Sequence, residues 1–300
     1  MKNEGRVSYS SRRYGAGAFM RRKQWWYFEG LDEARKLYFV FLALEAIPLS
    51  YVSLKVIDYG SGTRWTEDHF GPFKAAPGDR VDVHAAGKWG FLRFHGRAEE
   101  GWRIEVHTAR LHAEILQRPQ AELHANNLLT QHIDYSIRQF IQNECRGELA
   151  LEGRAGPFSG HGYHEHNWGV QPRHSTAHWL HFWSPAAAGV VLSCHYDQGL
   201  PHHYTFLWTG GAEKTLHSPA EFLFDPAEPD KPWKVVSPDL QIEARPVSGH
   251  TTRIRVPPLL PYLDVDYFEQ LLEVRGRAIV EGRDLQISGM GKLDFNWNRW

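Results

Sequence analysis

Alternating hydrophobic and polar residues predict β-strands along most of the chain. Glycine-containing turns separate the clearest runs, and a spacing of about ten residues is typical of an antiparallel meander or barrel. These four runs are 80–84, 89–94, 102–107 and 111–116. The polar stretch 125–127 is expected to end this block.

Further runs predict strands on both sides of this block. The aromatic run 24–30 ends in Gly30 and is typical of a strand that enters a turn. Residues 37–57 predict one or two long strands around Pro48, with a short helix over 31–44 as an alternative. In the second half, short strands are predicted at 189–196, 203–209, 220–224, 233–236, 240–244 and 252–256.

One segment of 25 residues occurs twice. Residues 144–168 align without gaps on 273–297 at a constant offset of 129, and eleven of the 25 positions are identical. A period of this length is too long for a solenoid. The repeat therefore predicts two similar β domains, each ending in the same hairpin, with Glu-Gly-Arg at its turn.

Strand alternation divides the end of this repeat into two faces. Without a bulge, one face of the first copy carries Phe158, Gly160, Gly162, His164, His166 and Trp168. The second copy has Ile287, Gly289, Gly291, Leu293, Phe295 and Trp297 there. Because this second set is apolar, we expect the face to point into a core in both copies.

The stretch 160–169 contains three histidines, a glutamate, an asparagine and a tryptophan within eight residues. His164 and His166 replace Leu293 and Phe295 of the second copy, so the fold itself does not require them. Buried imidazoles need partners, and a functional role and a satisfied structural role both remain open. The second copy repeats Asn167 and Trp168 unchanged, which favours a structural role for these two positions unless they also line the pocket. It keeps the acid of Glu165 as an aspartate, so a structural and a functional role both remain open for Glu165.

Composition and charge exclude some classes of protein. The formal net charge is -1, which gives no reason to expect a nucleic-acid partner, and the 12 Trp, 12 Tyr and 16 Phe suit a β-rich protein with an apolar pocket. No apolar run is long enough to span a bilayer. Two cysteines without a CxxC motif, and no apolar run behind the basic residues 1–23, predict a cytoplasmic protein without a signal peptide or stable membrane insertion.

The residues 162–169, Gly-Tyr-His-Glu-His-Asn-Trp-Gly, resemble the signature of a known family. This family contains AttH-like proteins, carotenoid 1,2-hydratase (hydroxyneurosporene synthase), plant tocopherol cyclase and fungal decalin-forming Diels–Alderases. The run Gln24-Trp25-Trp26-Tyr27-Phe28 resembles its N-terminal Trp-Trp-Tyr motif. The resemblance spans residues 24–300, although only these motifs and the repeat are specific.

The resemblance implies an all-β fold of two lipocalin-like antiparallel barrels in tandem. We predict a flexible basic arm over 1–23, a first barrel over 24–170 and a second over 171–300. The implied activity is cofactor-free hydration or cyclisation of a lipophilic polyunsaturated substrate, by alkene protonation or by pericyclic preorganisation. The motif defines neither the reaction nor the substrate, and the sequence does not predict an oligomeric state.

Glu165 is the candidate general acid, with His164 or His166 orienting it or relaying its proton. Strand alternation places Glu165 opposite both histidines, so a bulge or an interface pocket is needed for joint action. Aromatic walls can stabilise a carbocation. The predicted substrate-binding residues are Trp25, Trp26, Tyr27, Tyr163, Asn167, Trp168, Trp179 and Trp183.

Two other classes of protein remain open. A lipocalin-type carrier would bind a lipophile without chemistry. A metalloenzyme would use His164 and His166 as ligands, as cupin-like barrels do. However, Val170 and Gln171 stand where a cupin places a glutamate, so no metal site is predicted.

Overall fold

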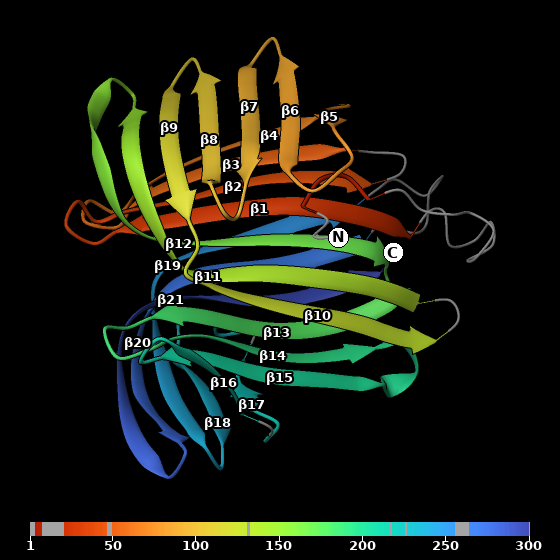
Figure 1. The fold of residues 1–300 in the computed structure, drawn as a ribbon, viewed down its shortest axis with the longest axis vertical. Helices are drawn as coiled ribbons and strands as arrows, with labels where there is room; N and C mark the ends of the chain where they lie inside the picture. The colour runs from red at the N-terminus through yellow and green to blue at the C-terminus, as the bar shows by residue number, and fades with distance from the viewer. Residues whose placement is uncertain are drawn as a thin grey trace. The chain divides into compact units, whose positions relative to one another are not determined.

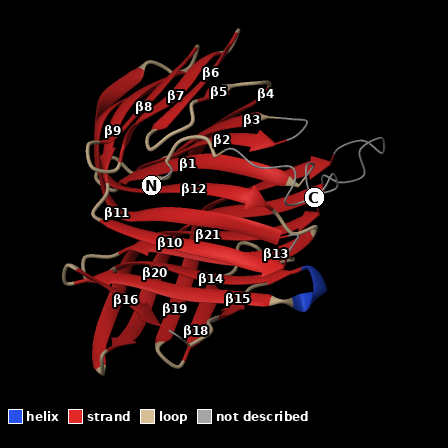
Figure 2. Ribbon diagram, turned by 45° about the vertical axis from the view of Figure 1, so that its right-hand side comes forward, coloured by secondary structure: helices blue, strands red, loops and turns tan. Residues whose placement is uncertain are grey.

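The computed structural model describes residues 4–7, 21–46, 50–130, 133–216, 218–225, 227–255 and 264–299. Within these residues the chain is almost entirely β-strand, and the one helix is the short 3-10 turn η1 (Asp197–Gly199) (Figure 2). No helix in this part of the chain is long and apolar enough to cross a bilayer. The chain divides into two compact units, Met1–Gln171 and Pro172–Trp300.

Unit 1 contains one antiparallel sheet of 12 strands among the described residues. Its order is β4-β3-β2-β1-β12-β11-β9-β8-β7-β6-β5, and β10 pairs with β11. The strands are β1 (Arg22–Asp32), β2 (Leu37–Ala46), β3 (Tyr51–Asp58), β4 (Thr63–Phe70), β5 (Lys74–Ala75), β6 (Val81–Gly87), β7 (Gly90–Arg97), β8 (Gly101–Thr108), β9 (Leu111–Arg118), β10 (Ala121–Thr130), β11 (Ile133–Leu151) and β12 (Arg154–Val170).

The long strand β11 connects the two halves of this sheet. Its first half pairs with β10 and its second half with β9, while β12 runs beside both halves. The sheet therefore curls on itself, and β6–β9 cross β1–β4 steeply (Figure 1). Apolar side chains from both halves form the core between them, among them Phe28, Phe41, Phe94 and Ile104.

Unit 2 repeats this plan with one antiparallel sheet of nine strands in its described part. The order is β16-β15-β14-β13-β21-β20-β19-β18-β17. The strands are β13 (His174–Trp183), β14 (Ala188–Tyr196), β15 (Pro201–Thr209), β16 (Ala212–Leu216), β17 (Glu221–Leu223), β18 (Trp233–Ser237), β19 (Leu240–Arg255), β20 (Asp264–Val280) and β21 (Arg283–Arg299). Its own core includes Leu180, Trp233, Leu272 and Leu293.

These sheets confirm the prediction of an all-β fold with two lipocalin-like antiparallel barrels in tandem, and each unit is a single antiparallel sheet curled into a half-barrel. The predicted repeat hairpins are β11–β12 and β20–β21. Both turns have two successive residues with positive φ, Glu152-Gly153 and Glu281-Gly282. This geometry matches the twist of the flanking strands and explains why glycine occupies the second turn position in both copies.

Some strand predictions differ from the structure. β10 continues through residues 125–127, which were expected to end the block. The prediction of strands over 37–57 is confirmed by β2 and β3, and the alternative of a short helix over 31–44 is not (residues 31–32 end β1 and 37–46 are β2). The predicted strand 240–244 and the described part of the predicted strand 252–256 belong to one strand, β19, which passes Pro246 through a bulge between Pro246 and Ser248. Pro48 lies outside the described residues.

Part of the predicted flexible arm packs against unit 1. Glu4 is buried, its backbone oxygen accepts a hydrogen bond from Trp26 Nε1 at 2.9 Å, and its carboxylate accepts one from Trp102 Nε1 at 3.0 Å. Arg6 forms a β-bridge with Pro77. Residues 4–7 therefore belong to the packed structure of unit 1, and residues 1–3 and 8–20 lie outside the described residues.

Candidate active site

The two motifs of unit 1 lie side by side on neighbouring strands. β1 and β12 are antiparallel, and Tyr27 pairs with Glu165 while Trp26 pairs with His166. β11 runs along the other edge of β12. The Trp-Trp-Tyr run and the histidine-rich stretch therefore form one continuous patch of sheet with two faces.

His164 lies on the core face of this patch and is fully buried. Its ring stacks on Phe28 and Phe140, with centroids 3.8 and 5.4 Å away. Its Nδ1 is 2.9 Å from the backbone oxygen of Tyr27, whereas its buried Nε2 has no hydrogen-bond partner among the described residues. Burial holds the pKa of His164 well below its ordinary value, so the ring is neutral.

His166 faces the same core and is also buried. It stacks on Trp26 with centroids 4.9 Å apart, and its centroid is 4.7 Å from that of Trp168. The prediction that this face points into the core is therefore confirmed. It also follows that Trp26 and Trp168, predicted to bind substrate, are on the core face with the histidines.

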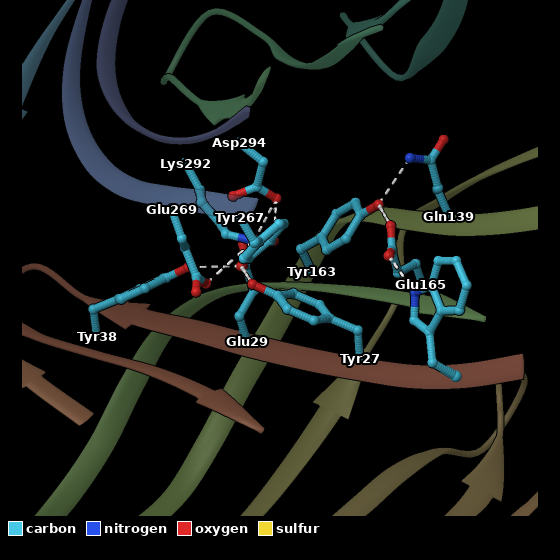
Figure 3. Close-up of polar contacts among 11 residues, drawn as sticks. Tyr27, Glu29, Tyr38, Gln139, Tyr163, Glu165, Tyr267, Glu269, Lys292 and Asp294 are labelled. Atoms are coloured by element: carbon cyan, nitrogen blue, oxygen red, sulfur yellow. Dashed lines mark hydrogen bonds and ion pairs between the residues drawn. The ribbon is translucent and has the colours of Figure 1, made fainter. Parts of the chain in front are cut away.

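Glu165 lies on the opposite face and has two directed hydrogen-bond partners (Figure 3). Its Oε1 accepts a hydrogen bond from Trp25 Nε1 at 2.9 Å, and its Oε2 accepts one from the Tyr163 hydroxyl at 2.7 Å. Gln139 Nε2 in turn donates to the Tyr163 hydroxyl at 2.8 Å. A relay from Gln139 through Tyr163 therefore ends on a carboxyl group that is 6% exposed.

A second buried carboxylate, Glu29, lies on the same face. It accepts hydrogen bonds from the Tyr27 hydroxyl at 2.6 Å and from the Tyr38 hydroxyl at 2.7 Å. The sequence prediction missed both Glu29 and Tyr38. Alternation along β1 could have identified Glu29, because it follows Trp25 and Tyr27 on one strand face.

The amide of Asn167 belongs to this face as well. It is fully buried, and neither its nitrogen nor its oxygen has a hydrogen-bond partner among the described residues. At the corresponding position of unit 2, the oxygen of Asn296 accepts a hydrogen bond from Asn298 at 2.7 Å. A buried amide without partners is costly, so the amide oxygen of Asn167 is available to a ligand, whereas the oxygen of Asn296 already accepts a hydrogen bond.

The predicted cooperation of Glu165 with His164 and His166 does not fit this arrangement. β12 pairs with β1 in one unbroken register, and the irregularity opposite β12 lies in β11, between Phe140 and Asn143. The bulge that would bring the three side chains together is therefore not present in β12. The groups that orient Glu165 are Trp25 and Tyr163, and the two histidines pack in the core behind them.

Unit 2 carries a different polar group at the equivalent positions (Figure 3). Lys292 stands at the position of Tyr163 and Asp294 at that of Glu165, and their side chains form an ion pair at 2.8 Å. The Tyr267 hydroxyl donates to Asp294 at 2.6 Å, and Glu269 lies 3.3 Å from Lys292. Burial raises the pKa of Asp294 to about 6, although Lys292 acts in the opposite direction.

The predicted binding residues Trp179 and Trp183 lie on β13 of unit 2. Trp179 pairs with Asp294, and the ammonium of Lys292 is 5.3 Å from the centre of its ring. Trp183 has its ring centroid 5.0 Å from that of His181. Both indoles alternate with the core residues Leu180 and Phe182, so they line the face opposite the core of unit 2.

Neither His164 nor His166 belongs to a group of three metal-ligating side chains within the described ranges. His164 instead uses one nitrogen for a backbone oxygen, and both rings stack between aromatic side chains. The residues present therefore do not favour the metalloenzyme alternative at this position.

In comparisons by sequence, no protein-family model and no curated protein matches the chain. Solved structures do match. An AttH protein from Nitrosomonas europaea aligns with a TM-score of 0.64 at 11% identity and covers 96% of this chain and 96% of that chain.

Two further structures align over most of their lengths. Kievitone hydratase from Nectria haematococca has a TM-score of 0.63 at 13% identity and covers 90% of this chain and 88% of that chain. CghA, solved with Sch210972, has a TM-score of 0.62 at 10% identity, with coverages of 93% and 88%. The chain therefore shares the fold of the AttH protein, kievitone hydratase and CghA.

Proposed function

We propose that the protein is a cofactor-independent enzyme of the hydratase or cyclase type. Its substrate is a lipophilic, unsaturated small molecule, and Glu165 is the catalytic acid. The observation that carries this proposal is the buried carboxyl group of Glu165, held by Trp25 and Tyr163 on the face opposite the core.

Proton addition to an alkene needs an acid that is fixed in position and shielded from water. The two hydrogen bonds fix both oxygens of Glu165, and the Gln139–Tyr163 pair fixes the hydroxyl that contacts Oε2. In its carboxylic acid form, Glu165 gives its proton to one alkene carbon. In hydration, water captures the cation at the other carbon and the resulting oxonium loses a proton, which restores Glu165. In cyclisation, a second alkene captures the cation and closes a ring, and the new cation formed in this step loses a proton from an adjacent carbon, which restores Glu165.

The neighbouring side chains suit such a substrate. Trp25 and Tyr27 offer aromatic faces that can stabilise a developing cation. The amide of Asn167 has no hydrogen-bond partner among the described side chains and backbone, and it can hydrogen-bond a polar group of the substrate, which would remove the cost of its burial. One of the proteins with the same fold is named kievitone hydratase, which supports a hydratase-type reaction for this chain.

Solvent isotope incorporation tests the reaction class. The native protein is extracted with organic solvent, the ligand is identified by mass spectrometry, and the ligand or kievitone is incubated with the enzyme in D2O. Hydration adds one water and places deuterium on carbon, and protonation-driven cyclisation places deuterium on carbon without adding water. A pericyclic reaction would incorporate none and would contradict the role of Glu165 as acid.

Substitutions separate an enzyme from a carrier. We expect Glu165→Gln to lower kcat at least 100-fold, because general acid catalysis contributes about 10²–10⁴-fold. Tyr163→Phe should lower it by about tenfold through loss of one fixing hydrogen bond. Glu144→Gln, on the paired strand β11, is the matched control. A lipophile that is bound by all three variants and turned over by none of the proteins, wild type included, would identify a carrier.

A further inference from the structure

A cluster of potential metal ligands lies on the hairpin β8–β9, outside the candidate active site. His107 and His112 are directly paired across the hairpin, and Glu114 follows His112 on the same face. The Nδ1 atoms of the two histidines are 3.2 Å apart. One oxygen of Glu114 lies 3.8 Å from His107 Nε2 and 3.7 Å from His112 Nε2.

The surrounding structure holds the two imidazoles in place. The Thr108 hydroxyl accepts hydrogen bonds from the backbone nitrogens of Arg110 and Leu111 at 3.1 and 3.0 Å, which fixes the turn between the strands. Phe91 stacks on the ring of His107 with centroids 4.8 Å apart. A ligand set on a fixed hairpin loses little conformational freedom when it binds an ion.

The charge pattern around the cluster favours a cation. Glu114 is paired directly with Glu105 on one neighbouring strand and with Glu148 on the other. Three carboxylates therefore form a row across β8, β9 and β11, and like charges that face each other across strands are destabilising. Glu105 already lies 3.8 Å from Arg93 and 3.5 Å from His95, so the repulsion that remains is mainly between Glu114 and Glu148. A cation bound at Glu114 would offset this repulsion.

We propose that His107, His112 and Glu114 form a binding site for a divalent transition metal of the zinc class. Two imidazoles and one carboxylate are the donor set of an open zinc site, in which water takes the remaining position. At zinc–nitrogen distances of about 2.0–2.1 Å, tetrahedral ligands lie about 3.4 Å from one another. The two histidine nitrogens are already near this separation, and the three ligand atoms all lie within 4.8 Å of one another.

Solvent can reach this site. The side chains of His107, His112 and Glu114 are 42%, 39% and 63% exposed. An ion can therefore enter without any opening of the sheet, and water can complete its coordination. The site lies on the outer face of the hairpin, because Leu111, Ala113 and Ile115 alternate with the ligands and point into the core.

Zinc titration of the full chain tests this site. The protein is freed of metal with a chelator, dialysed and titrated with Zn²⁺ by calorimetry, and Co²⁺ absorption reports the ligand geometry. We expect one equivalent with a micromolar Kd that His112→Gln weakens at least tenfold. Glu114→Gln should weaken it less, and His84→Gln, on β6 and separated from β8 by β7, is the matched control.

The result is decided by the difference between variants. Loss of one equivalent in His112→Gln but not in His84→Gln, with unchanged circular dichroism, supports the site. Equal uptake by both variants, or no uptake by the wild-type protein at 100 times the protein concentration, overturns it. A Co²⁺ spectrum that His112→Gln leaves unchanged would overturn it as well.

Discussion

His164 is a neutral histidine inside an aromatic core. At the corresponding position the second unit has Leu293, so a nonpolar side chain is compatible with this fold. Since burial lowers the pKa of His164 in the folded protein, acid protonates this ring in the unfolded chain first. The contribution of His164 to stability is therefore full above about pH 6.5 and is lost as the pH falls below it.

We expect His164→Phe to remove this acid sensitivity. Between pH 7.5 and 5.5, the free energy of unfolding of the variant should rise by about 1 kcal/mol relative to wild type. Urea unfolding at both pH values measures the change. His161→Phe, at an exposed position of the same strand, should show no such relative gain. A difference that stays constant with pH would mean that folding does not shift the pKa of His164.

Asp294 titrates in the opposite sense. Burial raises its pKa to about 6 from 3.8, so the folded protein binds this proton more tightly than the unfolded chain does. The stability from this group is therefore present at low pH and is lost as the pH rises from about 4 to 6. Asp294→Asn should accordingly gain stability relative to wild type across this interval.

Urea denaturation between pH 4 and 7 checks this prediction, with Asp284→Asn at an exposed site of β21 as control. A relative loss of stability over the same interval would show that the Lys292 ammonium outweighs burial.

At the scale of elements, the glycines of the two repeat hairpins are under different constraints. A Cβ on Gly162 would overlap Gln117 Nε2 and Cys145 Sγ, and Gln117 already donates to the backbone oxygen of Glu29 at 2.9 Å. On the equivalent Gly291, a Cβ would meet its nearest atom, the backbone oxygen of His181, at 2.9 Å. Unit 1 therefore tolerates a methyl group here less well than unit 2.

We expect Gly162→Ala to destabilise the protein by at least about 2 kcal/mol more than Gly291→Ala, since overpacking a filled site typically costs about 1–3 kcal/mol. Chemical denaturation of the two single variants provides the comparison. Equal losses would indicate that Gln117 moves aside without cost.

Strand alternation and the repeat predicted the hairpins and the face on which each side chain lies, because successive side chains of a strand point to opposite faces of the sheet once the register is set. The relay to Glu165 could not be predicted in this way. Trp25 is separated from Glu165 by 140 positions, and only the pairing of β1 with β12 brings them together. The sequence did not predict that β19 is one continuous strand, because proline usually ends a strand unless it lies at a bulge, as Pro246 does here.

At the scale of the whole molecule, the segment 4–7 contributes a buried charge to unit 1. The carboxylate of Glu4 accepts hydrogen bonds from Trp102 and from the backbone of Ala98, and it lies 3.7 Å from the guanidinium of Arg138. Burial raises the pKa of Glu4, which shows that its desolvation exceeds the gain from these partners.

Removal of this side chain leaves its buried donors without an acceptor. Glu4→Ala should therefore lower the free energy of unfolding by about 2–3 kcal/mol. Tryptophan fluorescence during urea unfolding measures the loss. The exposed Glu100→Ala is the control, and a loss below about 0.5 kcal/mol for Glu4→Ala would show that the contacts of Glu4 contribute little.

In both units, the first strand pairs with the last: β1 with β12, and β13 with β21. During synthesis, β1 can therefore pair with β12 only after residues 154–170 have been made, whereas the meander β6–β9 can form from segments that are adjacent in the sequence. Sequence-distant pairing slows folding and prolongs the exposure of apolar strands. The same order that brings Trp25 to Glu165 thus makes the candidate active site one of the last parts of unit 1 to assemble during synthesis.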